Sequence, residues 1–127
     1  MSLDIRIDNA VPSRTTIAPA GKLDATTYLD FDRKIDSVLA QIPTGGTLVV
    51  DLAKLEYISS AGLRSLFRAR KAMKIKGGHS LVVHAQPQVR KVFEIVKAVP
   101  VHEVFSSIEE LDAYLDDMQR KVVDGDA

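Results

Sequence analysis

Residues 47–63 read TLVVDLAKLEYISSAGL, and this stretch decides the fold. Its first six residues form a nearly continuous apolar run, which is typical of a strand buried on both faces of a parallel sheet. We interpret residues 54–58 as a connection. Ser59 and Ser60 come next, directly before a segment whose apolar residues have helical spacing. A buried strand followed by a connection and a helix is the repeating unit of α/β proteins.

The segments on either side extend this pattern. Alternating polar and apolar residues predict a strand at 4–9, and 15–20 is predicted as a second extended segment. We expect the two to pair as an antiparallel hairpin. Helices are predicted to begin near residues 26, 60, 87 and 107, with further strands at 80–84 and 101–105. The order predicts a mixed sheet of four to five strands with about four helices. The hairpin forms its antiparallel edge and the other strands are parallel.

The apolar faces of the helices give the expected core. The helix that follows Ser60 should bury Leu63, Leu66, Phe67 and Met73, and 80–84 should be a buried strand. Ser107 and Glu110 match a capping box that opens the last helix. That helix should bury Ile108, Leu111, Leu115 and Met118 and leave its acids mostly in solvent (Glu109, Glu110, Asp112, Asp116 and Asp117).

Length and composition limit the class of protein. The chain has 127 residues, 46% of them hydrophobic, which suits one domain over 1–127 with a core at about 4–116 and a frayed tail at 120–127. Its 17 basic and 17 acidic side chains argue against a nucleic-acid binder. The chain has no Cys, and no uncharged stretch is long enough to span a membrane. We therefore expect a cytoplasmic protein without membrane insertion.

Few residues suggest catalysis or metal binding. The sequence has no phosphate-binding loop, no dinucleotide fingerprint and no nucleophile elbow. The histidines, His79, His84 and His102, lie near the ends of predicted strands without ligand spacing, so we expect no metal site. The basic side chains at 64–76 are interpreted as a solvated helix face, with an anionic partner surface as the alternative.

Ser59 and Ser60 stand where a helix N-cap belongs. A serine there can accept hydrogen bonds from the first-turn amides, which is the simplest interpretation. A helix start also favours negative charge, so a hydroxyl at this position is a candidate for phosphorylation. A third hypothesis, a small hydrolase that uses Ser60 with His84, requires the two side chains to lie within hydrogen-bond reach.

Three motifs in order resemble STAS domains, the anti-sigma factor antagonist family. They are residues 49–63, the segment Gly-Lys-Leu-Asp-Ala at 21–25, and Gly77-Gly78 with the later 87–93. The resemblance implies the STAS-like fold described above and a bacterial phosphoprotein that regulates transcription, with no catalysis and no cofactor of its own. Its implied partners are a GHKL-type serine kinase that doubles as the anti-sigma factor, and a PP2C-type phosphatase.

The resemblance also implies residue roles. The family pattern Asp-Ser-[Ser/Thr]-Gly-Leu, anchored on the glycine and leucine at 62–63, puts Ser60 on the phospho-acceptor, with Ser59 as its rival. Ser59 stands where the family has Asp, and Ala61 stands in place of a second hydroxyl. The implied partner-binding residues are Asp24, Ser59, Ser60, Ala61, Gly62 and Arg64, with a partner or a neighbouring loop against the bare backbone of Gly62. The alternative function is a non-switching STAS subunit of a lipid-transport ABC complex.

Overall fold

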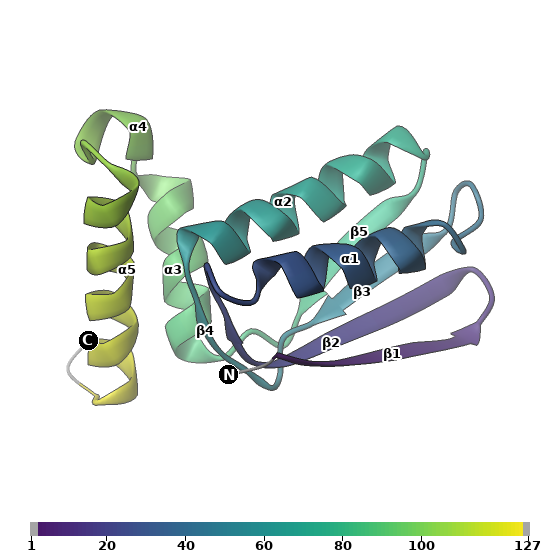
Figure 1. The fold of residues 1–127 in the computed structure, drawn as a ribbon, viewed down its shortest axis with the longest axis horizontal. Helices are drawn as coiled ribbons and strands as arrows, with labels where there is room; N and C mark the ends of the chain where they lie inside the picture. The colour runs from purple at the N-terminus through teal and green to yellow at the C-terminus, as the bar shows by residue number, and fades with distance from the viewer. Residues whose placement is uncertain (1–2, 126–127) are drawn as a thin grey trace.

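The computed structural model describes residues 3–125 as one sheet and five helices (Figure 1). The strands are β1 (Asp4–Val11), β2 (Arg14–Leu23), β3 (Thr47–Asp51), β4 (Leu55–Ile58) and β5 (His79–Val83). The helices are α1 (Tyr28–Leu39), α2 (Ser60–Ile75), α3 (Pro87–Ala98), α4 (Val101–Val104) and α5 (Ile108–Val123). The predicted fold class, a mixed sheet with an antiparallel N-terminal hairpin, is confirmed.

Strand β2 organises the sheet because it is long enough to pair with three neighbours. One edge pairs with β1 in antiparallel fashion. The other edge pairs in parallel with β3 through residues 14–17 and with β4 through residues 21–23. Strand β5 extends the sheet beyond β3. The segment that we interpreted as a connection at 54–58 is therefore largely a strand, because the second half of β2 still offers it free backbone groups.

Helices α1 and α2 cover one face of the sheet, while α3 and α5 stand side by side beyond its end, next to β4 (Figure 1). The core lies under α1 and α2 and is formed by fully buried side chains such as Ile17, Leu48 and Phe31. Arg68 of α2 joins the two helices through an ion pair with Asp36 of α1 at 2.7 Å. Five of the six basic side chains at 64–76 are nevertheless exposed, as expected for a solvated helix face.

Some of the expected burial is wrong because only one face of the sheet is covered. Strand β5 lies at the sheet edge, and its Leu81 and Val82 are about half exposed. In β3, Leu48 and Val50 are buried but Val49, on the opposite face, is partly exposed. A strand with a continuous apolar run is thus packed on one side only.

Two helical side chains that we expected in the core are on the surface. Phe67 of α2 is 50% exposed and Ile108 of α5 is 53% exposed. Phe67 lies on the side of α2 that looks past the sheet edge toward α3, where no element covers it. Ile108 is in the first turn of α5, at the margin of that helix's buried stripe.

The C-terminal part of the chain differs most from prediction. Residues 101–105 were predicted as a strand, but they form the single turn α4, in which the Pro100 carbonyl accepts from the amides of Glu103 and Val104. This segment joins α3 to α5 away from any free sheet edge, so its β propensity has no partner. The predicted tail at 120–127 is also wrong in part, because α5 continues to Val123, with Arg120 paired to Asp116. Residues 126–127 lie outside the described residues.

None of the helices within residues 3–125 is both long enough and apolar enough to cross a membrane.

Candidate functional site

The two serines occupy the junction between β4 and α2. Ser59 is the N-cap of α2 in extended conformation, and its amide donates to the Leu23 carbonyl at 3.0 Å. Ser60 is the first helical residue. Both are almost inaccessible, at 5% and 8% exposed. Neither hydroxyl is therefore presented to solvent.

Asp112 of α5 holds Ser60 at both of its donors. The Ser60 amide donates to Oδ1 of Asp112 at 2.8 Å, and the Ser60 hydroxyl donates to Oδ2 at 2.8 Å. Hydrogen bonds to an ionised acceptor are the stronger kind, and a negative charge at a helix N-terminus is favoured. Asp112, which we expected in solvent with the other acids of α5, is instead the side chain that caps α2.

The expected serine cap does not form. Ser59 makes no side-chain hydrogen bond to the first turn of α2, and its hydroxyl is buried without a partner among residues 3–125. Asp112, 52 positions along the chain, instead accepts from the Ser60 amide, the first donor of the helix. By contrast, the cap predicted at Ser107 is confirmed, because its hydroxyl accepts from the Glu110 amide at 3.1 Å.

Gln119 makes a second polar connection between α5 and this junction. Its Oε1 accepts from the Ile58 amide at 3.0 Å, and its Nε2 donates to the Ile58 carbonyl at 2.8 Å. Gln119 is 2% exposed and Ile58 is fully buried. One side chain thus satisfies both backbone groups of a β4 residue, as a neighbouring strand would do.

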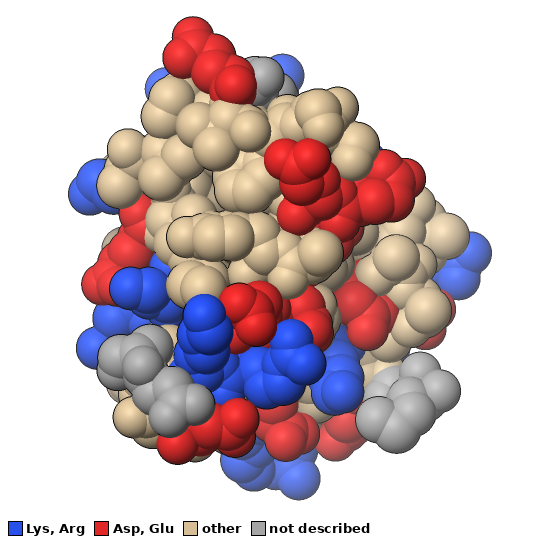
Figure 2. Space-filling view, turned by 90° about the vertical axis from the view of Figure 1, so that its left-hand side faces the viewer, with Lys and Arg blue, Asp and Glu red and all other residues tan. Residues whose placement is uncertain are grey.

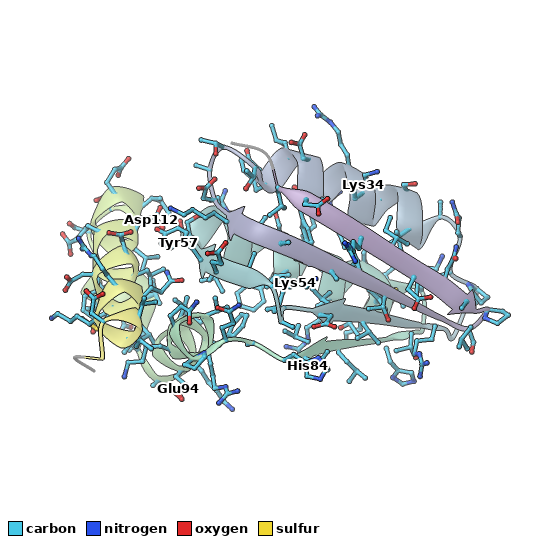
Figure 3. The ribbon with its side chains drawn as sticks, turned by 90° about the horizontal axis from the view of Figure 1, so that it is seen from below. Lys34, Lys54, Tyr57, His84, Glu94 and Asp112 are labelled. Carbon is cyan, nitrogen blue, oxygen red and sulfur yellow. The ribbon has the colours of Figure 1, made fainter. Side chains whose placement is uncertain are left out.

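Tyr57 lies between the end of the sheet and α5, with Asp112 close by (Figure 3). Burial raises the pKa of its phenol to about 12, helped by the negative charges of Asp116, Asp112 and Asp24. The Nζ of Lys22 lies 5.8 Å from the ring centroid, where a cation is attracted by the ring face. Carboxylates therefore lie around Tyr57, with Lys22 close to its ring.

Asp24 organises the turn that leads into α1. Its Oδ1 accepts from the Thr26 amide at 2.9 Å and from the Thr26 hydroxyl at 2.7 Å, while its own amide donates to the Thr27 hydroxyl at 3.0 Å. Partial burial raises the pKa of Asp24, but the hydrogen bonds from Thr26 and Thr27 outweigh that effect, so its pKa lies below the ordinary value. These bonds give Asp24 a structural role beside the partner-binding role that the resemblance implies.

The other predicted partner-binding residues divide into two groups. Ala61 and Gly62 are buried, and a Cβ added at Gly62 would come within 2.6 Å of the Leu23 carbonyl oxygen. The neighbouring loop therefore accounts for this glycine. Arg64 is exposed and, within residues 3–125, makes no ion pair. Their part in partner binding stays a prediction.

An apolar groove runs beside Ser60. It has a volume of about 580 Å³ and is lined by Ser60, Arg64 and Phe67 from α2 and, on the other side, by Val96, residues 99–101 and Leu111. The exposed Phe67 lies on its rim. Figure 2 looks onto the α5 side of the molecule and shows mostly uncharged surface in its upper part, with acidic side chains at the top and upper right and with basic and acidic side chains interleaved below.

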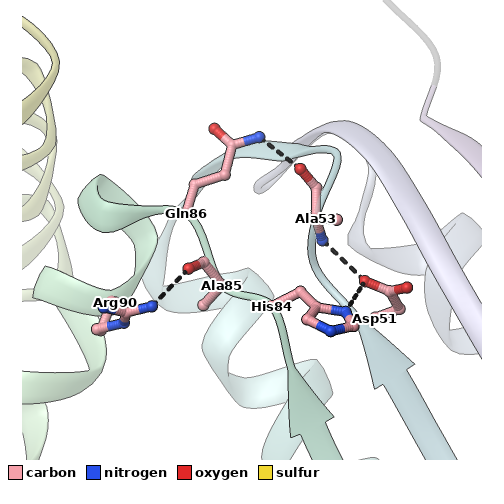
Figure 4. Close-up of polar contacts among 6 residues, drawn as sticks. All are labelled: Asp51, Ala53, His84, Ala85, Gln86 and Arg90. Carbon is pink, nitrogen blue, oxygen red and sulfur yellow. Dashed lines mark hydrogen bonds and ion pairs between the residues drawn. The ribbon is translucent and has the colours of Figure 1, made fainter.

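The histidines do not build a catalytic or metal site among the described residues. His84, with φ +61°, has its Nδ1 3.2 Å from Oδ1 of Asp51, which also accepts from the Ala53 amide (Figure 4). No hydrogen bond in residues 3–125 joins His84 to Ser60, whose hydroxyl is held by Asp112. No group of three or more possible ligands occurs within the same residues. The side chain of His102 lies outside the described part.

Asp112 and Gln119 are the site residues that sequence reasoning missed. Their signal was present but weak. Leu111, Leu115 and Gln119 are spaced by four residues, so a polar side chain continues the buried stripe of α5. Asp112 follows at the margin of that stripe. An amide in line with leucines indicates a buried partner, but the spacing does not say which partner.

The comparisons agree with this fold. Residues 3–111 match the family described as STAS domain. A protein of Bordetella bronchiseptica named "Putative anti-sigma factor antagonist BtrV" is 39% identical over 71 residues, which are 55% of this chain and 61% of that protein. The chain therefore spans less than two thirds of this relative's length.

Two solved structures are similar in fold. An anti-sigma factor antagonist from Mycobacterium paratuberculosis superposes with a TM-score of 0.64 at 20% identity, over 92% of this chain and 94% of that one. The anti-sigma factor antagonist SpoIIAA in its unphosphorylated form gives 0.59 at 17% identity, over 72% and 82%. The chain belongs to the STAS domain family.

Proposed function

We propose that the chain is an anti-sigma factor antagonist that works by partner switching. In its unphosphorylated form it binds a GHKL-type serine kinase that is also the anti-sigma factor. Phosphorylation of Ser60 breaks that complex, and a PP2C-type phosphatase restores it. The chain itself catalyses nothing, needs no cofactor and acts in the cytoplasm. The names of the relative and of both structural neighbours support this class of function.

The position of Ser60 at the start of α2 is the observation that carries the proposal. Ser60 is the first residue of α2, and its hydroxyl donates to the carboxylate of Asp112. It also borders an apolar groove beside the exposed Arg64. SpoIIAA has been solved in a phosphorylated form as well, which supports a phosphorylated state for a STAS domain of this fold. Ser59 stays the rival acceptor, because its hydroxyl makes no hydrogen bond within residues 3–125 that phosphorylation would have to break.

Phosphorylation would oppose partner binding mainly through charge. A phosphoserine adds about −1.5 to −2 charges at pH 7. Two unit charges about 6 Å apart at an effective dielectric near 20 interact by roughly 3 kcal/mol. A penalty of about 3–5 kcal/mol lowers affinity roughly a hundredfold to several-thousandfold.

The experiment is a pull-down from the native cell with tagged wild-type chain, Ser60→Ala and Ser60→Asp, followed by mass spectrometry. We expect Ser60→Ala to retain a kinase and Ser60→Asp to lose most of it. Ser13→Ala, the same change at an exposed serine in the turn between β1 and β2, is the matched control and should behave as wild type, while Ser59→Ala tests the rival acceptor. Modification of Ser59, with Ser60→Ala still released, would move the switch to the rival serine.

A second candidate is a non-switching STAS subunit of a lipid-transport ABC complex. The burial of both serines favours it, because a subunit without a phosphorylation switch needs no accessible hydroxyl. In that case the pull-down recovers a permease and an ATPase with wild type and Ser60→Asp alike, and neither serine carries phosphate.

A further inference from the structure

We propose that α5 is a lid over Ser60, latched by Asp112, and that the closed lid and a phosphorylated Ser60 exclude each other. The lid is inferred from contacts within the chain. Its role in regulating phosphorylation rests on the proposed function.

The closed state leaves Ser60 without a free donor, and little of the residue is exposed where it borders the apolar groove. One carboxylate accepts from both its amide and its hydroxyl, and the residue is 8% exposed. A phosphoryl donor must reach Oγ in line with the bond that forms. The hydroxyl therefore has to leave Asp112, and the N-terminal part of α5 has to move, before the reaction can occur.

The face of α5 that covers the junction is continuous. Leu111, Asp112, Leu115 and Gln119 fall within about 100° of the helix circumference, and both leucines are buried. Asp112 holds Ser60, and Gln119 holds Ile58 about two turns further along. The lid thus has two polar latches with apolar packing between them.

The rest of α5 packs mainly on α3, with which it forms a helical hairpin through α4 (Figure 1). Its contacts with α2 are fewer. Helix α5 can therefore leave Ser60 while it keeps the larger part of its packing. Opening at the latch requires the loss of local polar bonds, and the core under α1 and α2 stays intact.

A phosphate at Ser60 removes the hydrogen bonds to Asp112 that keep the lid closed. When the kinase transfers the phosphoryl group, the Oγ–P bond forms, the bond from phosphorus to the nucleotide leaving group breaks, and the Ser60 hydroxyl proton passes to a base of the kinase. Asp112 then has no donor left on Oγ and faces phosphate oxygens of like charge. Both anions compete for the Ser60 amide, where a helix N-terminus favours the more highly charged group. Asp116 and Asp24 add negative charge around the neighbouring Tyr57, where Lys22 is a nearby cation, and Arg64 lines the groove beside Ser60. The closed lid and phosphorylated Ser60 exclude each other. A change that raises the closed-to-open ratio of the lid tenfold therefore lowers the rate of phosphorylation about tenfold.

Residue-resolved amide hydrogen exchange tests the lid without any kinase. The reporter is the Ile58 amide, which Gln119 holds and which no latch variant touches directly. The Val50 amide in β3 is the reference for global unfolding. We expect the Ile58 exchange rate, relative to Val50, to rise at least tenfold in Asp112→Ala and in protein carrying phosphoserine at 60. Asp117→Asn, the same loss of charge on the exposed side of α5, should leave it unchanged.

The second arm measures phosphorylation by the kinase recovered in the pull-down. We expect Asp112→Ala to be phosphorylated at least tenfold faster than wild type, with Asp112→Asn intermediate because an amide can still accept from the Ser60 N–H. Slower phosphorylation of both variants would show that the lid does not restrain phosphorylation. It would indicate instead that Asp112 accepts the Ser60 proton during the transfer. An unchanged Ile58 ratio in Asp112→Ala and in the phosphoserine protein would overturn the lid. Faster Ile58 exchange with no phosphorylation of any variant would support the lid and refute the proposed function.

Discussion

Replacing Gln119 with Leu should destabilise the domain far more than an ordinary change on a C-terminal helix. The variant removes the partners of the Ile58 amide and carbonyl, both in a fully buried residue. Each buried backbone group left without a partner costs about 1–3 kcal/mol. Leu fills the same space with apolar surface and offsets about 1 kcal/mol of this loss. We expect a net loss of about 3 kcal/mol.

Urea unfolding followed by circular dichroism measures this loss. With a slope of about 2 kcal/mol/M, the midpoint should fall by about 1.5 M. Gln41→Leu, the same change at an exposed position after α1, is the control and should shift the midpoint by less than about 0.3 M. If Gln119→Leu unfolds at the wild-type midpoint, Gln119 does not act as the missing neighbour of β4 and the latch at this end of α5 does not exist.

Three further predictions concern the same end of the molecule. Gly62→Ala should lower stability by about 1–2 kcal/mol, because the contact with the Leu23 carbonyl outweighs the helix propensity gained; a raised melting temperature would contradict this. Asp24→Ala should lose about 1 kcal/mol at pH 7. Since the pKa of Asp24 is lowered on folding, its contribution is present above the carboxyl's unfolded pKa and lost as pH falls through the folded value, so wild type and variant should converge in acid. Tyr57 should ionise near pH 12 in a titration at 295 nm, and Tyr57→Phe should remove that step; its raised pKa makes stability fall as pH rises from about 10.

Local pattern was enough to predict most elements of the fold. Each of these segments shows its secondary structure in the spacing of its own apolar residues. Examples are the alternation in 4–9, the extended segment at 15–20, the apolar run at 47–52 and the helical spacing after Ser60. The motifs at 49–63, at 21–25 and at 77–78 with 87–93, taken together and in this order, also sufficed to find the family. These features depend on residues a few positions apart, which a sequence displays directly.

Tertiary structure decided the rest, because the deciding partners are distant in the chain. Residues 101–104 have the composition of a strand but meet no free sheet edge, so they form a helical turn. Residues 55–58 look like a connection but meet the free half of β2, so they form a strand. Ser60 has the sequence of a self-capped, accessible helix start, yet Asp112 caps it and covers its hydroxyl across 52 positions. A hydrogen bond between side chains that far apart forms only after the chain has folded, and nothing in the local pattern of either residue specifies the other.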